Sequence, residues 1–114
     1  MSDCLFCNIA AGNSETDLVY EDEKVVAFED INSQAPVHFL IVPKKHIPTL
    51  NDIEDTDKEL IGHIYQVAAK LASENNIAED GYRVISNCNE DGGQTVFHLH
   101  FHLLGGRQLQ WPPG

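Results

Sequence analysis

Three histidines near the end of the chain alternate with apolar residues: His98, His100 and His102 are separated by Leu99 and Phe101. Alternate side chains of a β-strand point to opposite faces, so we expect the three imidazoles on one face and the apolar side chains on the other. Imidazole titrates near neutral pH and can act as an acid, a base or a nucleophile toward phosphorus. The spacing also permits an exposed polar face or a three-histidine metal site. We favour catalysis, because a solvated face needs no particular residue type.

The residues just before this stretch are suited to holding phosphate oxygens. Asn87 offers a side-chain amide and Thr95 a hydroxyl. Gly92-Gly93-Gln94 offers a run of backbone N–H groups, and at the two glycines no Cβ obstructs access to them. A Gly-Gly pair alone usually only turns a hairpin. Next to aligned histidines, it predicts a phosphate site.

Two of the three cysteines, Cys4 and Cys7, form a C-x-x-C pair, and the third is Cys88. In a reducing compartment an odd set with such a pair indicates metal or redox use before a disulfide scaffold. Two thiolates can be completed to a tetrahedral zinc site by two distant imidazoles. The alternative is a pair of reduced cysteines in a short helix.

Hydrophobic periodicity predicts the elements that position these residues. We expect a short helix over 4–12 and a long helix from 56 to about 75, which begins at a capping box of Thr56 and Glu59. Strands are expected over 18–20, 25–28, 38–42, 82–87 and 96–104, with a glycine turn at 91–93 between the last two. This order predicts one α+β domain over residues 1–114, with an antiparallel sheet of about five strands.

Composition excludes several classes of protein. Hydrophobic residues make up 42% and charged residues 22%, which is typical of a globular domain. Seven basic against 18 acidic residues give a net charge of −11, which repels nucleic acid. We find no apolar run long enough for a membrane span and no signal-peptide pattern, so we expect a cytoplasmic protein without a membrane partner. A chain of this size gains from self-association, and we expect a homodimer.

The stretch from His98 to Leu104 resembles the signature of the histidine triad (HIT) family of nucleotide hydrolases and transferases. The likeness extends over nearly the whole chain and is greatest to the Hint branch of the family. It is carried by Asp30-Ile31, residues 34–46, Gly81-Tyr82-Arg83, Gly92-Gly93-Gln94, Gly105-Gly106-Arg107 and the tail Trp111-Pro112-Pro113-Gly114. The resemblance implies a HIT-like fold that dimerises through its long helix and a strand.

The resemblance also implies an activity: hydrolysis of the P–N bond of adenosine or guanosine 5′-phosphoramidates through a nucleotidyl-histidine intermediate. His100 would be the nucleophile, and His102 and His98 would orient or polarise the site. His38 would lie behind His100 as an orienting partner, for which a core histidine bonded to the backbone is the alternative. The implied ligands of the phosphate and ribose are Asn87, Gly93, Gln94, Thr95 and, for the ribose hydroxyls, Asp30. The implied purine slot, for which plain core packing is the alternative, is formed by Phe6, Ile9, Phe28 and Ile31.

The C-x-x-C pair resembles that of bacterial relatives that bind zinc. By that likeness Cys4 and Cys7 would share a structural zinc with His46 and His98, and catalysis itself would need no cofactor. Trp111 would reach the partner subunit's substrate site, unless the tail is a disordered terminus. Rival functions are hydrolysis of dinucleoside polyphosphates, nucleotidyl transfer, a nucleotide-binding regulator, and a purely structural zinc module.

Overall fold

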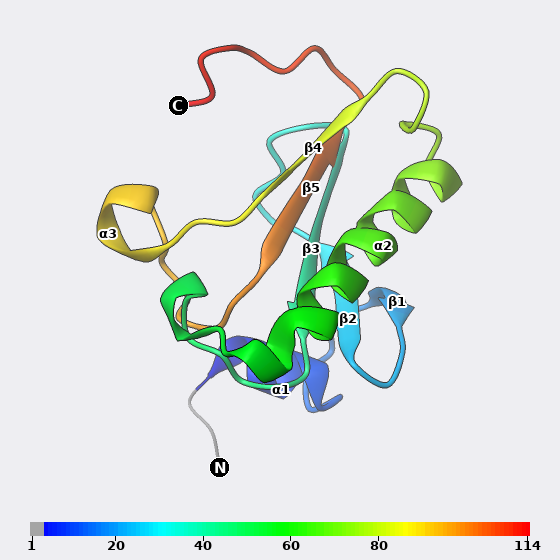
Figure 1. Ribbon diagram of the computed structural model, residues 1–114. Coiled ribbons are helices and arrows are strands. Elements are labelled where there is room, and N and C mark those ends of the chain that lie inside the picture. The colour runs from blue at the N-terminus through cyan, green and yellow to red at the C-terminus, as the bar shows by residue number, and fades with distance from the viewer. Residues whose placement is uncertain (1–3) are drawn as a thin grey trace.

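The computed structural model describes residues 4–114, and its centre is a sheet of five strands (Figure 1). The strands lie in the order β1-β2-β3-β5-β4, and every neighbouring pair is antiparallel. Their bounds are β1 Leu18–Glu21, β2 Val25–Glu29, β3 Val37–Pro43, β4 Tyr82–Ile85 and β5 Phe101–Gly105. The predicted α+β class with an antiparallel sheet of about five strands is confirmed.

The helices of the described residues are α1 Leu5–Ala10, α2 Lys58–Glu74 and α3 Asn89–Gly92, with short 3-10 turns η1 Leu50–Asp52 and η2 Asp55–Asp57. The long helix α2 begins two residues later than predicted, and the predicted capping box is wrong. Thr56 lies in η2, whose own capping box pairs Glu54 with Asp57. Asp57 also accepts a hydrogen bond from the Lys45 ammonium at 2.5 Å, so its carboxylate is occupied just before α2 starts. The predicted glycine turn at 91–93 is the end of α3.

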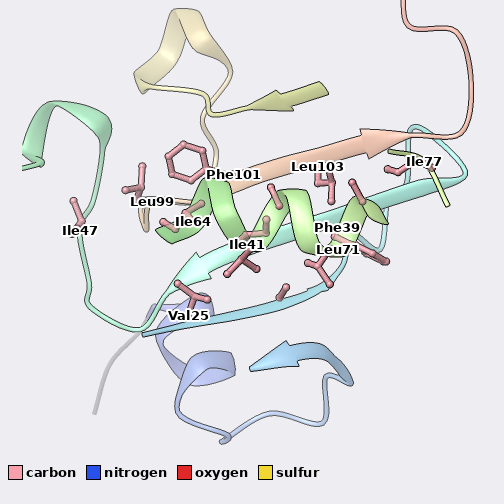
Figure 2. Close-up of a cluster of buried hydrophobic side chains, with 14 residues drawn as sticks. Val25, Phe39, Ile41, Ile47, Ile64, Leu71, Ile77, Leu99, Phe101 and Leu103 are labelled. Carbon is pink, nitrogen blue, oxygen red and sulfur yellow. The ribbon is translucent and has the colours of Figure 1, made fainter. Parts of the chain in front are cut away.

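Each face of the sheet carries its own hydrophobic cluster, because the side chains of the strands alternate. Val25 and Ala27 of β2 face α2, whereas Val26 and Phe28 face α1. Figure 2 shows the cluster on the α2 side, where Ile64 and other α2 side chains pack on the sheet. The α1 side buries its own helical residues, Phe6, Ile9 and Ala10.

The last strand is shorter than predicted: β5 begins at Phe101, whereas the pattern predicted a strand from residue 96. Pairing on both sides of β5 stops near this point, since Ile41 is the last residue of β3 that pairs with β5, opposite Phe101, and β4 ends at Ile85, opposite His102. β3 ends at Pro43, which has no N–H to continue a ladder. Residues 96–100 nevertheless keep the sidedness of a strand, because Leu99 is buried in the α2-side cluster together with Phe101.

A search of residues 4–114 finds no helix that is long and apolar enough to cross a membrane.

Candidate functional site

A cavity of about 470 Å³ lies on the face of the sheet that α1 covers. Its walls come from α1, the end of β2, the loop that follows α3, and the segment that leads into β5. Two of the three alternating histidines, His100 and His102, line it. The other lining residues are Leu5, Phe6, Ile9, Thr16, Phe28, Glu29, Asp30, Ile31, Leu40, Asn87, Gly93, Thr95 and Val96.

The imidazole of His100 is held by the backbone so that one ring nitrogen is left available. Its Nδ1 lies 2.7 Å from the carbonyl oxygen of His98, so Nδ1 carries the proton and donates it. Neutral imidazole then has its lone pair on Nε2. Phe6 packs edge-on against the ring, with centroids 5.0 Å apart and planes at 90°. His100 is 8% exposed and therefore presents an oriented, nucleophilic nitrogen inside the cavity.

His102 is oriented by a chain of two hydrogen bonds that begins at a backbone amide. The Gln34 N–H donates to Nδ1 of His38 at 3.0 Å, so the proton of neutral His38 lies on Nε2. That Nε2–H lies 2.9 Å from Nδ1 of His102 and donates to it. His102 accordingly carries its own proton on Nε2. Burial lowers the pKa of His102 to about 4 and lowers that of His38 as well, so both rings are neutral at neutral pH.

The position of His38 corrects one expectation from the sequence. His38 was expected behind His100, but it lies against His102. The register explains this, because Leu40 of β3 pairs with His102 and places His38 diagonally across the two strands. The alternation of side chains along β3 predicts on which face of the sheet His38 lies. Which side chain His38 contacts on that face depends on strand pairing.

Asp30 lies beside this pair, with its Oδ2 3.3 Å from Nε2 of His38 and 3.8 Å from Nδ1 of His102. The three side chains are close enough to share a metal ion. The hydrogen bonds argue against that use, because Nε2 of His38 carries a proton and a ligand nitrogen needs a free lone pair. Asp30 instead accepts a hydrogen bond from the Asn32 N–H through Oδ1, at 2.8 Å, at the edge of the cavity.

His98 faces away from the cavity, toward the two cysteines of the N-terminal pair. Its Nε2–H donates to the carbonyl oxygen of Pro43 at 2.8 Å, which leaves Nδ1 unprotonated. Nδ1 lies 3.2 Å from Sγ of Cys4, 3.3 Å from Sγ of Cys7 and 3.1 Å from Nδ1 of His46. The imidazoles of the histidine stretch therefore do not converge, and a site built from all three of them is not formed.

The four ligand atoms of Cys4, Cys7, His46 and His98 all lie within 4.8 Å of one another, as the resemblance implied. Ligand atoms around a tetrahedral zinc at bond lengths of about 2.0–2.3 Å lie roughly 3.3–3.8 Å apart. Four of the six separations are 3.1 to 3.3 Å, and these need only a small outward shift. Thiolate and imidazole donors suit zinc, so the chemistry and the geometry of this cluster fit the metal.

The loop after α3 differs from the expected phosphate cradle. The Gly93 N–H donates to Glu90 and the Gln94 N–H to Asn89, so both amides are used inside the α3 turn. Gly93 has a φ of 84°, a left-handed conformation that glycine adopts without strain, and its Cβ-free face lines the cavity. The polar side chains that this region does turn into the cavity are Asn87 and Thr95.

Gln94 has a different place from the one expected for it. Its buried side-chain amide donates to the carbonyl oxygens of Pro48 and Val96 and accepts from the Asn89 N–H. All of these partners belong to the protein backbone. The side chain lies outside the cavity lining and ties the α3 loop to the segment that follows β3.

The expected purine slot is present in part as a buried surface. Phe6, Ile9 and Phe28 are buried in the α1-side cluster and line the cavity. Ile31 lines it too, but its side chain is fully exposed at the mouth. Sequence reasoning missed five further lining residues: Leu5, Thr16, Glu29, Leu40 and Val96. Only Leu40 had a usable signal, since it follows His38 by two residues on β3.

Trp111 lies outside the cavity of its own chain. Its side chain is 79% exposed, and the Arg83 guanidinium lies 6.0 Å from its ring centroid. Arg83 also donates to the carbonyl oxygen of Gln110, so the tail is tethered to β4 (Figure 1).

Comparison with known proteins agrees with this geometry. The domain model of the HIT family matches residues 11–109. The Escherichia coli K12 purine nucleoside phosphoramidase is 50% identical over 105 residues, which cover 92% of this chain and 88% of that protein. A HIT family hydrolase from Legionella pneumophila has a TM-score of 0.96 and 54% identity, covering 98% of this chain and all of that one. A histidine triad protein from Clostridium difficile has a TM-score of 0.93 and 48% identity, covering 96% of each chain. The chain belongs to the HIT family.

Proposed function

We propose that this protein hydrolyses the P–N bond of purine nucleoside 5′-phosphoramidates. The observation that carries the proposal is the state of His100, whose Nδ1–H is bound to a backbone carbonyl and whose Nε2 is left available in a cavity of nucleotide size. The 50% identity to a protein named purine nucleoside phosphoramidase supports the same substrate class.

The cavity divides into parts that match the parts of such a substrate. The purine would occupy the apolar slot formed by Phe6, Ile9, Phe28 and Ile31. Asp30 would accept the ribose hydroxyls, since its carboxylate lines the cavity between the slot and the histidines. Asn87 and Thr95 would donate to the phosphate oxygens. Gly93 would let the phosphate approach the backbone, and Gln94 would hold this loop in place.

The chemistry would follow from the proton positions of the two imidazoles. Nε2 of His100 attacks phosphorus as the P–N bond to the amine breaks, and the leaving nitrogen takes up a proton from solvent while Nε2–H of His102, placed in the cavity, donates a hydrogen bond to it. The product is a nucleotidyl-histidine. Water then attacks phosphorus and loses a proton to solvent, the N–P bond breaks so that His100 is again a neutral imidazole, and the nucleoside monophosphate leaves. These steps use side chains of the chain itself.

Charge in the cavity favours this substrate over a dinucleoside polyphosphate. The lining residues in the described part of the chain contain Glu29 and Asp30 but no lysine or arginine. A long polyphosphate would bring several negative charges without a cationic partner. A single tetrahedral phosphorus can be bound by neutral donors and the imidazoles. The rival functions of nucleotidyl transfer and nucleotide-dependent regulation would use this same site. Measurements of turnover distinguish them from hydrolysis.

We also propose that Cys4, Cys7, His46 and His98 hold one structural zinc. The zinc would cross-link the N-terminal segment to two distant parts of the chain. In this arrangement the side chain of His98 serves the metal, and its backbone carbonyl serves His100.

The experiment that tests the proposed reaction replaces the nucleophile. We expect His100→Ala to abolish single-turnover cleavage of a fluorogenic adenosine phosphoramidate, while AMP binding measured by calorimetry stays within about tenfold, because a nucleophile contributes mainly to the transition state. His63→Ala, on α2 and outside the cavity, is the matched control and should keep its turnover. Cleavage retained in His100→Ala would refute the assignment.

A further inference from the structure

We infer that the metal cluster and the cavity are thermodynamically coupled through α1, so that zinc and a purine nucleotide each strengthen the binding of the other. The inference deepens the proposed function, because it takes the nucleotide as the occupant of the cavity. It rests on two separate connections between the cluster and the cavity walls.

The first connection is α1 itself, which supplies metal ligands and cavity walls from neighbouring residues. Cys4 is the N-cap of α1 and Cys7 lies within it. Leu5, Phe6 and Ile9 of the same helix line the cavity. A displacement of the helix backbone that carries the two sulfur atoms therefore also displaces the wall of the purine slot.

The second connection is His98, which serves both sites with different atoms. Its Nδ1 lies among the cluster atoms, and its carbonyl oxygen accepts the Nδ1–H of His100 at 2.7 Å. Phe6 of α1 contacts the histidines of the second connection directly. Its ring packs edge-on against both imidazoles, with ring centroids 6.2 Å apart for His98 and 5.0 Å apart for His100.

A helix of six residues depends on such anchors. Isolated helices this short are unstable in water, since one turn fixes several dihedrals for few hydrogen bonds. The side-chain cap of α1 is an atom of the metal cluster, Sγ of Cys4, which accepts the Cys7 N–H at 3.2 Å. Burial of Phe6, Ile9 and Ala10 would keep α1 on the sheet without metal. Metal loss should therefore loosen the slot without unfolding the domain.

Linkage makes the effect reciprocal and measurable without turnover. We expect AMP affinity, measured by calorimetry, to be about tenfold weaker in chelator-stripped protein than in zinc-loaded protein. Cys4→Ser/Cys7→Ser should bind AMP as weakly as the stripped protein and carry no zinc. Cys88→Ser is the matched control, since this third cysteine is neither in the cluster nor in the cavity lining. It should keep both zinc and AMP affinity.

The second measurement starts from the folded, zinc-loaded protein and follows zinc transfer to a chromogenic chelator. Saturating AMP should lower the equilibrium transfer by the same factor of about ten, because both ligands favour the same placement of α1. Ribose 5-phosphate has the phosphate but no base to contact α1, so it should have little effect. This control separates coupling through the slot from weak binding of zinc by phosphate.

The outcomes distinguish this inference from the proposed function. AMP affinity that is the same with and without zinc, or zinc transfer that AMP leaves unchanged, would overturn the coupling and leave the proposed reaction standing. Failure of the zinc-loaded protein to bind AMP would overturn both. Zinc retained by Cys4→Ser/Cys7→Ser would overturn the metal assignment on which the coupling depends.

Discussion

At the scale of single residues, backbone groups decide which nitrogen of each histidine is available. The Gln34 N–H sets the proton of His38, the Pro43 carbonyl that of His98, and the His98 carbonyl that of His100. Backbone partners are a reliable way to select a tautomer, because their donor or acceptor character does not change with pH. The consequence is that neighbouring imidazoles receive different roles: one faces the metal cluster, one is nucleophilic and one donates a hydrogen bond into the cavity.

His38 is a positioning residue in this scheme, and its removal should slow the reaction without removing a group that contacts substrate. We expect His38→Ala to lower kcat by about 10- to 100-fold, as for other partners that orient a reactive imidazole. His38→Gln should recover part of the loss, because a glutamine amide can still donate to Nδ1 of His102. Steady-state kinetics would test this. Equal losses in both variants would show that the side chain matters only for packing.

At the scale of elements, β5 carries the site and depends on close packing at its far end. β5 is paired on both sides, with β3 and β4, so its position is set by the whole sheet. Gly105 ends β5 where the segment after α2 passes over it. A Cβ at Gly105 would lie 2.5 Å from Cδ1 of Ile77 and 3.1 Å from its Cβ. This contact leaves no room for any larger residue unless Ile77 moves.

Gly105→Ala should therefore lower the unfolding free energy by about 1–3 kcal/mol, the usual cost of overpacking a buried site. Ile77→Val removes Cδ1 and should restore part of that stability in the double variant. Chemical denaturation of the two single variants and the double variant gives the coupling energy. Additive losses would mean that the two side chains do not compete for space. Gly62→Ala, whose Cβ would meet nothing within 4 Å, is the control.

At the scale of the whole molecule, burial of imidazoles makes stability depend on pH. The unfolded chain protonates His102 near its ordinary pKa of 6.5, whereas burial lowers the pKa in the folded state to about 4. Between these values the unfolded state binds more protons. The unfolding free energy must then fall as the pH falls from neutral toward 4, and buried His38 acts in the same direction.

We expect His102 alone to contribute a loss of roughly 3 kcal/mol between pH 7 and pH 4. Denaturant unfolding of the wild type and of His102→Gln over this range would test the prediction. The wild type should lose stability more steeply than the variant, which cannot take up this proton. Because both proteins keep the Cys4/Cys7/His46/His98 cluster, any acid loss of metal cancels in the comparison. Parallel curves would contradict the prediction.

Assembly remains a prediction at the same scale, and the exposed edge of the sheet supports it. β4 is an edge strand with exposed Tyr82 and Ile85, and Tyr65 is half exposed on α2. Unpaired edges and apolar side chains favour pairing with a second copy. Light scattering should give a mass near twice 12.7 kDa. Ile85→Lys should shift the protein toward the monomer, whereas Val19→Lys at the β1 edge should not.

The tail belongs to this prediction, because Trp111 is exposed and lies outside the cavity of its own chain. Deleting residues 111–114 should change the preference among amine leaving groups more than it changes the dimer. Competition kinetics with two phosphoramidates that differ only in the amine would measure this. An unaltered preference would place the tail away from the partner's site.

What the sequence determined by itself was mostly local. Alternation at His98, Leu99, His100 and Phe101 assigned side chains to two faces, and this sidedness held where the strand itself did not. The 3.6-residue period likewise located α2 apart from its first turn. Local patterns succeed here because the backbone period alone decides which side chains share a face. The single domain over residues 1–114 and the cytoplasmic location also stay predictions.

Only the tertiary structure decided which side chains meet across elements. The β3–β5 register placed His38 against His102 instead of His100, and the packing of the α3 loop turned Gln94 toward the backbone. The same packing used the amides that had been expected to face phosphate. Strand order and register depend on contacts between segments far apart in the chain, and a local period carries no information about them. The sequence therefore located the histidines, and the three-dimensional pairing of strands assigned each of them a partner.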